Sequence, residues 1–412
     1  MTGERTSTSD ERKHCGGLPG VTPAATRMFI IRAMNTDGSR RTFLKSLAAT
    51  AAVVRPWARL RADPHAAPQP VQTPRIRFAA IGLNHSHLHG QIAAVTRGGG
   101  ELVSFYGKEP DLLEAFAKRY PSAKPARSVQ EILDDPSIRL IVSAAIPNER
   151  APLGIEVMRH GKDFMVDKPG STTTEQLSDV RRVQAETKRI YSVLVERHEH
   201  KGTTKAAELV KAGAIGKVIQ TVSLGPHRMN PESRPAWFFR REQCGGVLCD
   251  IASHHIDQFL FFTGSTEAEI VAAQAGNVHH PQYPELEDFG DVMLRGNGGA
   301  GYVRVDWFTP AGLTVFGDGR LTILGTDGYI EIRKSIDIAG RPGASHLFLV
   351  DDSSPRYIDC RDVILPYGER LVDDVINRTE TANPQQQTFL AMEIALRAEK
   401  NAQACCHLGE PR

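Results

Sequence analysis

The sequence predicts an α/β protein with a parallel sheet in its N-terminal half and a large, mostly antiparallel open sheet in its C-terminal half. Three observations lead to this fold class. Short apolar strands alternate with helices between residues 75 and 195, which is typical of βαβ units. Longer strands with glycine-containing turns follow between residues 217 and 333. With 412 residues, the chain is long enough for two domains.

The first domain begins with a buried strand that ends at a glycine. Strands are predicted at residues 75–83, 101–106, 140–145 and 164–166, and helices at residues 91–97, 111–120 and about 149–160. Because short apolar strands alternate with helices, this region is predicted to be a Rossmann-type dinucleotide-binding domain over residues 74–195.

The pattern changes after residue 197, and residues 196–412 are predicted to form a second domain. Its strands are predicted at residues 217–224, 270–279, 291–294, 301–307, 320–324 and 329–333, and its helices at residues 203–213, about 369–377 and 387–401. Hairpin turns at 296–301 and at Asp327-Gly328 indicate an antiparallel meander. A buried helix is expected to pack on one face of this meander.

Residues 1–73 are predicted to hold an export signal and a disordered linker. The pair Arg40-Arg41 in the run Ser-Arg-Arg-Thr-Phe-Leu-Lys precedes a short apolar segment at 46–54, which is typical of a Tat signal. That segment is too short and too rich in alanine to anchor the protein in a bilayer. Residues 55–73 are rich in Pro, Ala and Arg and indicate the linker. We therefore expect the Tat machinery as a partner and a periplasmic or other extracytoplasmic location.

The composition is that of an ordinary soluble globular protein, with 41% hydrophobic and 24% charged residues. The formal net charge is only +2, so the composition does not support nucleic-acid binding. The six cysteines have neither a disulfide-framework spacing nor a C-x-x-C spacing, and they do not indicate a redox compartment.

The stretch 244–264 is predicted to be one buried helix that begins at a pair of glycines and ends at Gly264. At about 100° per residue, Asp250, His254 and Asp257 lie on one narrow face of this otherwise apolar helix. A helix that is apolar nearly all round is buried. Its carboxylates and imidazole must therefore be paired or face a cleft.

Three interpretations of this polar face are possible: a structural Asp–His network, a metal site, or functional residues in a cleft. No H-E-x-x-H or cysteine-rich pattern accompanies the face, which disfavours a metal. His255 points to a different, apolar side of the helix and is predicted to be a hydrogen-bonded core histidine.

The first strand–helix turn reads Gly82-Leu-Asn84-His-Ser-His87, where a dinucleotide fingerprint would be G-x-G-x-x-G. Only the first glycine is present, although Asn84 can adopt a positive φ and preserve the tight turn. His87 stands in the place of the third glycine. His85, His87 and His89 could suggest a metal, but their alternate spacing in a turn is poor ligand geometry. We favour contacts of these histidines with phosphate or substrate.

The end of the second strand lacks the acidic residue that would bind the ribose hydroxyls of NAD. Gly107-Lys108 stands there instead, and a small residue followed by a cation favours the 2′-phosphate of NADP. The alternative is that Lys108 is an ordinary solvated lysine of a loop.

Together, these motifs resemble the Gfo/Idh/MocA oxidoreductases over about residues 75–400. The matching pieces follow the family's order. They are Gly82, Ile146-Pro147-Asn148, Asp167-Lys168-Pro169, residues 212–216, and Gly245-Gly246 with Asp250, His254 and Asp257. The family has Glu-Lys-Pro where this chain has Asp167-Lys168-Pro169. The departures are the altered glycine loop, Gly107, and Asp167 in place of glutamate.

The resemblance implies hydride transfer between a sugar-like or cyclitol hydroxyl and a nicotinamide nucleotide. It implies that Lys168 lies beside the nicotinamide, that His254 is the base, and that Asp250 positions the substrate or His254. It also implies a cis Lys168–Pro169 bond, cofactor contacts at Pro147 and Asn148, and a homo-oligomer formed through the exposed face of the second sheet. The cofactor is expected to be NADP or NAD, with NADP preferred, and to be tightly bound.

Two other functions stay open. The first is an exported glycosidase that uses a retained nucleotide for transient oxidation, which resembles some exported relatives. The second is a non-catalytic sugar-binding protein, because a fold does not fix a function.

Overall fold

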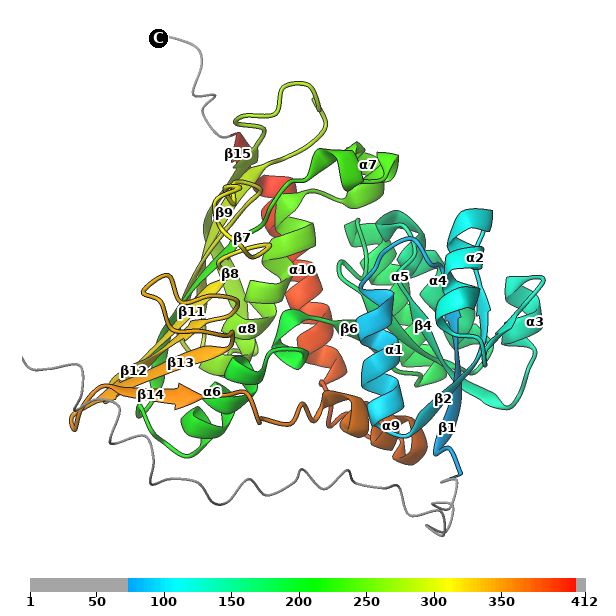
Figure 1. Cartoon of the computed structure of the whole chain (residues 1–412), viewed down its shortest axis with the longest axis horizontal. Helices are drawn as coiled ribbons and strands as arrows, with labels where there is room; N and C mark the ends of the chain where they lie inside the picture. Colours follow the sequence, from blue (N-terminus) through cyan, green and yellow to red (C-terminus); the bar gives the residue numbers. More distant parts are fainter. Residues whose placement is uncertain (1–72, 405–412) are drawn as a thin grey trace, which may run out of the picture. The chain divides into compact units, whose positions relative to one another are not determined.

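The computed structural model describes residues 73–404, in which a parallel sheet is followed by a mixed sheet (Figure 1). The predicted α/β fold class is confirmed. The predicted export signal lies outside the described residues. No helix in the described part of the chain is both long enough and apolar enough to cross a membrane.

The N-terminal sheet has six strands in the order β3-β2-β1-β4-β5-β6, and all neighbouring strands are parallel. Its strands are β1 (Ile76–Ile81), β2 (Gly100–Tyr106), β3 (Lys124–Pro125), β4 (Ile138–Ser143), β5 (Asp163–Asp167) and β6 (Tyr191–Leu194). The helices among them are α1 (Leu88–Arg97), α2 (Pro110–Arg119), α3 (Val129–Leu133), α4 (Pro147–Arg159) and α5 (Thr174–Thr187). The sequence patterns predicted most of these elements but missed β3, α3, α5 and β6.

The strand order of this sheet reverses between β1 and β4, which pair at its centre. Strands covered by helices on both faces are apolar throughout, and β1 is buried at every position except Arg77. Ligands of such sheets bind at the carboxyl ends of the strands where the order reverses. Gly82 lies at this point with φ +80°, and a Cβ atom there would lie 2.5 Å from the Cβ atom of Ala145. Only glycine fits this approach of the two chain segments.

The second sheet has nine strands in the order β14-β13-β12-β11-β7-β10-β9-β8-β15. Its strands are β7 (Val218–Pro226), β8 (Ala268–Gly276), β9 (Phe289–Gly296), β10 (Ala300–Asp306), β11 (Arg320–Gly325), β12 (Gly328–Arg333), β13 (His346–Asp351), β14 (Arg356–Asp359) and β15 (Gln403–Ala404). The expectation of an antiparallel meander is wrong at its centre, where β10 pairs with β7 in parallel. The chain makes a long helical excursion after β7 and returns from the far side through β8 and β9, which places β10 next to β7.

Helices cover one face of the nine-stranded sheet (Figure 1). The helix α8 (Ser253–Thr263) packs on β7 and β10, and α10 (Gln385–Asn401) packs on β8 and also contacts α5 of the first sheet. The remaining helices are α6 (Lys201–Lys211), α7 (Arg241–Cys244) and α9 (Tyr367–Asn377). The core between α8, α10 and the sheet is apolar.

The predicted single helix at 244–264 is wrong at its start. Helix α7 ends at Cys244, and Gly245 and Gly246 both have positive φ, which breaks the helical path. A π-helical turn at Leu248–Ala252 then leads into α8, which ends at Gly264 in the left-handed region as predicted. This wider turn changes the angular spacing between Asp250 and the residues that follow it.

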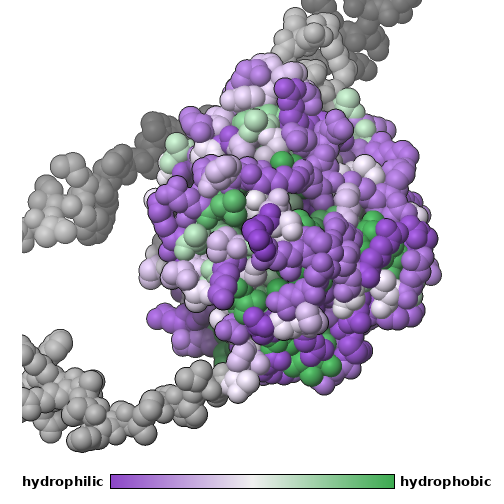
Figure 2. All heavy atoms as spheres, turned by 90° about the vertical axis from the view of Figure 1, so that its right-hand side faces the viewer, coloured by the Kyte–Doolittle hydropathy of each residue, from purple (hydrophilic) through white to green (hydrophobic). Residues whose placement is uncertain are grey.

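Seen from the side on which α2 and α3 lie in Figure 1, the molecular surface is largely hydrophilic (Figure 2). Apolar residues on this face form separate small patches rather than one continuous area. Scattered apolar surface of this kind is normal for a globular protein.

Candidate active site

A cavity of about 260 Å³ is lined by residues from the carboxyl edge of the first sheet and from the second sheet with its helices. Lys168 and Asp167 reach it from the end of β5, and Asp250 and His254 reach it from the π-helical turn and α8. Two halves of the chain that are far apart in sequence therefore contribute to one site.

The Nζ atom of Lys168 donates a hydrogen bond to Oδ1 of Asp250 over 2.7 Å. The Lys168 side chain is 7% exposed and that of Asp250 is 22% exposed, so the ion pair is largely shielded from water. Burial alone would raise the pKa of Asp250, but the adjacent Lys168 ammonium holds it below its ordinary value. The Asp250 carboxylate therefore stays ionised at neutral pH.

His254 lines the same cavity, but its hydrogen bond does not leave an unprotonated nitrogen free to accept a proton. Its Nδ1 accepts a hydrogen bond from the backbone N–H of Glu196 at 3.0 Å. Burial, together with the nearby Lys168 ammonium, lowers the pKa of His254 well below its ordinary value. The ring is thus neutral, and its single proton is on Nε2. This geometry favours a hydrogen-bond donor over the base expected from the sequence.

The other polar residues of the helix separate into different environments. Asp257 is buried away from the cavity, where Nε and Nη2 of Arg197 lie 2.7 and 3.2 Å from its carboxylate oxygens. His255 lines the cavity, and its buried Nδ1 has no hydrogen-bond partner. The expectation that His255 is buried is confirmed, although its ring reaches the cavity rather than a purely apolar side.

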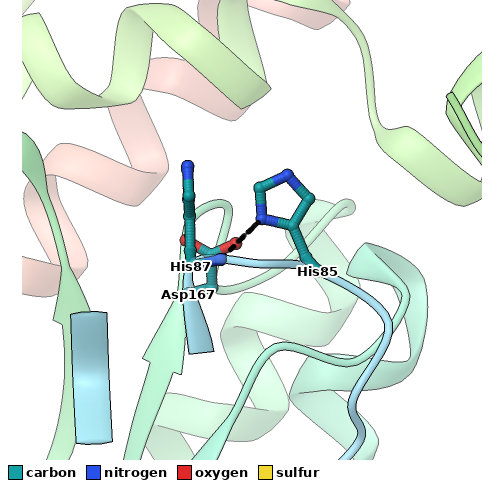
Figure 3. A group of neighbouring side chains, drawn as sticks. All are labelled: His85, His87 and Asp167. Atoms are coloured by element: carbon teal, nitrogen blue, oxygen red, sulfur yellow. Dashed lines mark hydrogen bonds and ion pairs between the residues drawn. The ribbon is translucent and has the colours of Figure 1, made fainter. Parts of the chain in front are cut away.

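The two histidines of the first strand–helix turn lie against Asp167 (Figure 3). Nδ1 of His87 is 3.0 Å from Oδ1 of Asp167, and Nδ1 of His85 is 3.4 Å from Oδ2. Asp167 also accepts hydrogen bonds from Nη2 of Arg150 at 3.1 Å and from the backbone N–H of Lys168 at 2.9 Å. Both histidines line the cavity that contains Lys168.

A second cleft, of about 380 Å³, lies where the strand order of the first sheet reverses. It is lined by four of the eight residues predicted to bind a nucleotide, namely Gly82, Asn84, Lys108 and Asn148, and also by Glu149. Pro147 instead lines the cavity with Lys168. The buried Oδ1 of Asn148 has no hydrogen-bond partner within residues 73–404, so it can accept one from a bound molecule. This free acceptor and the open space beside Gly82 fit a dinucleotide.

The mouth of this cleft carries two polar contacts that the sequence did not predict. Nζ of Lys108 is 2.9 Å from Oε1 of Glu149, and both side chains are exposed. Nδ2 of Asn84 donates to Oε1 of Glu109 at 2.8 Å. Asn84 does not have the positive φ expected of it, because Gly82 alone makes the left-handed turn in this loop.

Sequence reasoning also missed residues that build the cavity. Arg150 is 1% exposed, and its guanidinium binds Asp167 and the backbone carbonyls of Ala145 and Lys168. Trp237 and Phe316 line the cavity beside Arg234, whose guanidinium lies over aromatic rings. The aromatic run at residues 237–239 is the sequence signal that could have indicated this wall.

The fold and the site define the class as a two-domain oxidoreductase with a dinucleotide-binding domain. Residues 76–195 match the family described as "Oxidoreductase family, NAD-binding Rossmann fold", and residues 203–331 match the "GFO/IDH/MocA C-terminal domain". The chain belongs to the GFO/IDH/MocA family of oxidoreductases.

Similar curated proteins include two scyllo-inositol 2-dehydrogenases of Bacillus subtilis. The NADP(+) enzyme is 24% identical over 56% of this chain and 64% of its own length, and the NAD(+) enzyme is 25% identical over 63% and 74%. The match to the first thus spans less than two thirds of that protein. A solved structure from Erwinia carotovora atroseptica, designated an oxidoreductase, is 44% identical to this chain. The match covers 80% of this chain and 100% of the Erwinia chain, with a TM-score of 0.78.

The cis Lys168–Pro169 peptide bond implied by the family resemblance is present.

Proposed function

We propose that the protein transfers a hydride between a secondary hydroxyl of a sugar-like or cyclitol substrate and NAD(P). The observation that carries this proposal is the Lys168–Asp250 ion pair in the shielded cavity. Pro147 lines the same cavity and is the first residue of α4, and α4 also lines the nucleotide cleft. The named activities of the similar dehydrogenases support it.

In this reaction, Lys168 would donate a hydrogen bond to the substrate oxygen and stabilise the negative charge that develops on it. Asp250 would hold the Lys168 ammonium in place. His254, with its proton on Nε2, would donate a second hydrogen bond and orient the substrate. A bound nicotinamide supplies the hydride acceptor.

We propose that the aromatic wall selects a carbohydrate-like molecule. Trp237 and Phe316 offer apolar surfaces on which the C–H faces of a ring can pack, while Lys168, Asp250 and His254 offer groups that bond hydroxyls. A cavity with both apolar and polar lining residues suits a molecule that has both kinds of surface.

We propose NADP as the preferred cofactor. Gly82, Asn84 and Asn148 line the cleft that would hold the nucleotide, and Lys108 stands at the end of β2, where the ribose of a dinucleotide is bound in this type of fold. On binding NADP, the Lys108 ammonium would leave Glu149 and pair with the 2′-phosphate instead.

We also propose that the protein is exported by the Tat route, retains its nucleotide, and works as a homo-oligomer. Export rests on the twin arginines of the sequence. The oligomer rests on apolar side chains exposed on strands of the second sheet, namely Ile219, Val271, Met293 and Leu324.

The test of the function is the nucleotide that the native protein carries and the substrates that change its redox state. The purified protein is denatured, and the released nucleotide is identified by its spectrum and mass. The native protein is then mixed with inositols and sugars while the absorbance of the reduced nicotinamide is followed. Release of an aglycone from a chromogenic glycoside would instead indicate the glycosidase, and neither nucleotide nor turnover would indicate a binding protein.

A further inference from the structure

His87 and Asp167 form a dyad in which the tautomer of the histidine is determined by its partners. Asp167 accepts hydrogen bonds from Arg150 at 3.1 Å and from the N–H of Lys168 at 2.9 Å, as an ionised carboxylate does. Burial alone would raise the pKa of Asp167, but His87 and Arg150 hold it well below its ordinary value. A carboxylate has no proton to donate, so the 3.0 Å contact requires the proton on Nδ1 of His87.

The other ring nitrogen of His87 is therefore unprotonated in the neutral ring. Figure 3 shows that the Nδ1 edge of His87 faces Asp167 and that Nε2 points away from it. The side chain is 43% exposed and lines the cavity with Lys168. An imidazole whose Nδ1–H is bonded to a buried carboxylate presents Nε2 as a proton acceptor.

His254 has the opposite arrangement, because its Nδ1 accepts the N–H of Glu196 and its proton is on Nε2. His85 is also different: its Nδ1 accepts the backbone N–H of His87 at 3.3 Å. Three more histidines line the cavity. His200 has its Nε2, not its Nδ1, beside a carboxylate, His227 has its Nδ1 at the carbonyl of Gly225, and Nδ1 of His255 has no partner among the described residues. Of these cavity histidines, only His87 has its Nδ1 hydrogen-bonded to a carboxylate.

We propose that His87, rather than His254, is the acid–base residue of this site, with Asp167 as its positioning residue. The inference rests on the proposed function. As the C–H bond of the carbinol breaks and its hydride passes to the nicotinamide, the O–H proton passes to Nε2 of His87 and a C=O bond forms. The alcohol loses two electrons, the nicotinamide gains them, and the imidazolium releases the proton to solvent.

The charges around His87 suit this role. The titratable groups near it come from four elements: His85 in its own loop, Asp167 at the end of β5, Glu199 after β6, and His254 in α8. Arg150 and Lys168 are held in turn by Asp167 and Asp250. Asp167 stabilises the imidazolium as it forms, while Arg150 keeps Asp167 ionised so that the carboxylate does not take the proton itself.

The same three side chains, His85, His87 and Asp167, could instead hold a metal ion, since their ligand atoms lie within 4.8 Å of one another. The surroundings favour the dyad. Both oxygens of Asp167 already accept hydrogen bonds, and the guanidinium of Arg150 lies 3.1 Å from one of them, where it would repel a cation.

The test compares His87→Asn and His87→Gln with His160→Asn, which removes an exposed histidine of the C-cap of α4. Nitrogen NMR of the histidine rings is the readout that needs no activity. We expect the wild-type signal of His87 to show a protonated Nδ1 and an unprotonated Nε2. We also expect Asp167→Asn to change that tautomer. A protonated Nε2 in the neutral wild-type ring would overturn the inference.

Turnover and nucleotide affinity supply the second readout. In both His87 variants we expect kcat to fall by about 10²- to 10⁴-fold and nucleotide affinity to change far less. Unchanged kcat in an active wild-type background would overturn the inference while the proposed function stands. The same holds if the variants lose nucleotide affinity but keep kcat, since His87 would then be a phosphate ligand.

Two further outcomes separate the remaining possibilities. Stoichiometric Zn²⁺ in the wild-type protein, lost in His87→Asn and required for turnover, would overturn the dyad in favour of a metal site. A wild-type protein with neither nucleotide nor turnover would overturn the proposed function and this inference together.

Discussion

Lys168 at the end of β5 and Asp250 in the π-helical turn before α8 form an ion pair of 2.7 Å that joins the two halves of the chain inside the cavity. Each charge makes the burial of the other tolerable, because an ammonium or carboxylate shielded from water requires a partner of opposite charge. The pair also leaves the remaining hydrogens of the ammonium free to contact a substrate. The following predictions start from this site.

Replacing Lys168 by alanine should lower kcat by about 10²-fold or more, because the developing charge on the substrate oxygen loses its donor. The substitution also leaves the Asp250 carboxylate without its counter-charge, so some loss of stability is expected. Lys168→Met keeps most of the side-chain volume and so separates the loss of the ammonium from the loss of packing. Lys118→Ala removes an exposed lysine of α2 and is the control for losing a lysine outside the site. Circular dichroism checks folding, and a variant with near wild-type kcat would contradict the role of Lys168.

The variant His254→Asn should lower kcat but leave the acid limb of the pH–rate profile in place. The reason is that His254 is neutral, with its pKa lowered by burial and by Lys168, so it does not titrate in the range where activity is measured. The profiles of His254→Asn and His87→Asn are measured side by side. Loss of the acid limb in His254→Asn alone would restore His254 as the base.

The buried neutral histidines should make the protein less stable as the pH falls below 6.5. Burial, with Lys334 nearby, lowers the pKa of His255 from 6.5 to about 3. Between these values the unfolded chain takes up a proton that the folded protein does not. Stability is therefore complete above pH 6.5 and falls by about 1.4 kcal/mol per pH unit for each such histidine.

The variant His255→Gln should reduce this slope, measured by urea unfolding between about pH 6.5 and 5, where most carboxylates stay ionised. His160→Asn is the matched control, because it removes an exposed histidine ring. Equal slopes for wild-type protein and His255→Gln would show that the His255 ring is protonated in the fold.

The cofactor preference depends on the Lys108–Glu149 ion pair of 2.9 Å at the mouth of the nucleotide cleft. Lys108→Ala should weaken NADP binding and leave NAD binding nearly unchanged, because only NADP offers a 2′-phosphate. Glu149→Gln should have the opposite effect on NADP, since it removes a competing carboxylate. Titration of each variant with both nucleotides measures this, and parallel changes for NAD and NADP would argue against a 2′-phosphate contact.

Nucleotide retention follows from the proposed export. A free pool of nicotinamide nucleotide is not expected outside the cytoplasm, so an exported enzyme must fold around its cofactor and regenerate it within its own reaction cycle. Retention after dilution needs a binding free energy nearer ~12 kcal/mol, at nanomolar Kd, than ~8 kcal/mol, at micromolar Kd. Native mass spectrometry of protein recovered from the periplasm should detect bound NADP(H). Empty protein that reduces freely exchanging NAD would contradict retention.

Much of the fold was predictable because it depends on local patterns. The alternation of apolar strands with helices requires a parallel sheet, and an apolar run such as β1 has to be covered on both faces. Asp250 and His254 were predictable as candidates because polar side chains on an otherwise apolar helix need a partner or a cleft. Lys168 was predicted from the family resemblance. Gly82 was predictable because a tight turn after the first strand requires positive φ.

Contacts between segments far apart in the sequence were decided only by the tertiary structure. The π-helical turn at Leu248–Ala252 contains Asp250 and precedes α8, and a fixed 100° rotation per residue does not include such a turn. The tautomers of His87 and His254 depend on Asp167, 80 residues from His87, and on the backbone of Glu196, 58 residues from His254. A sequence states which groups can accept or donate a proton, but only the packed chain determines which nitrogen each partner reaches.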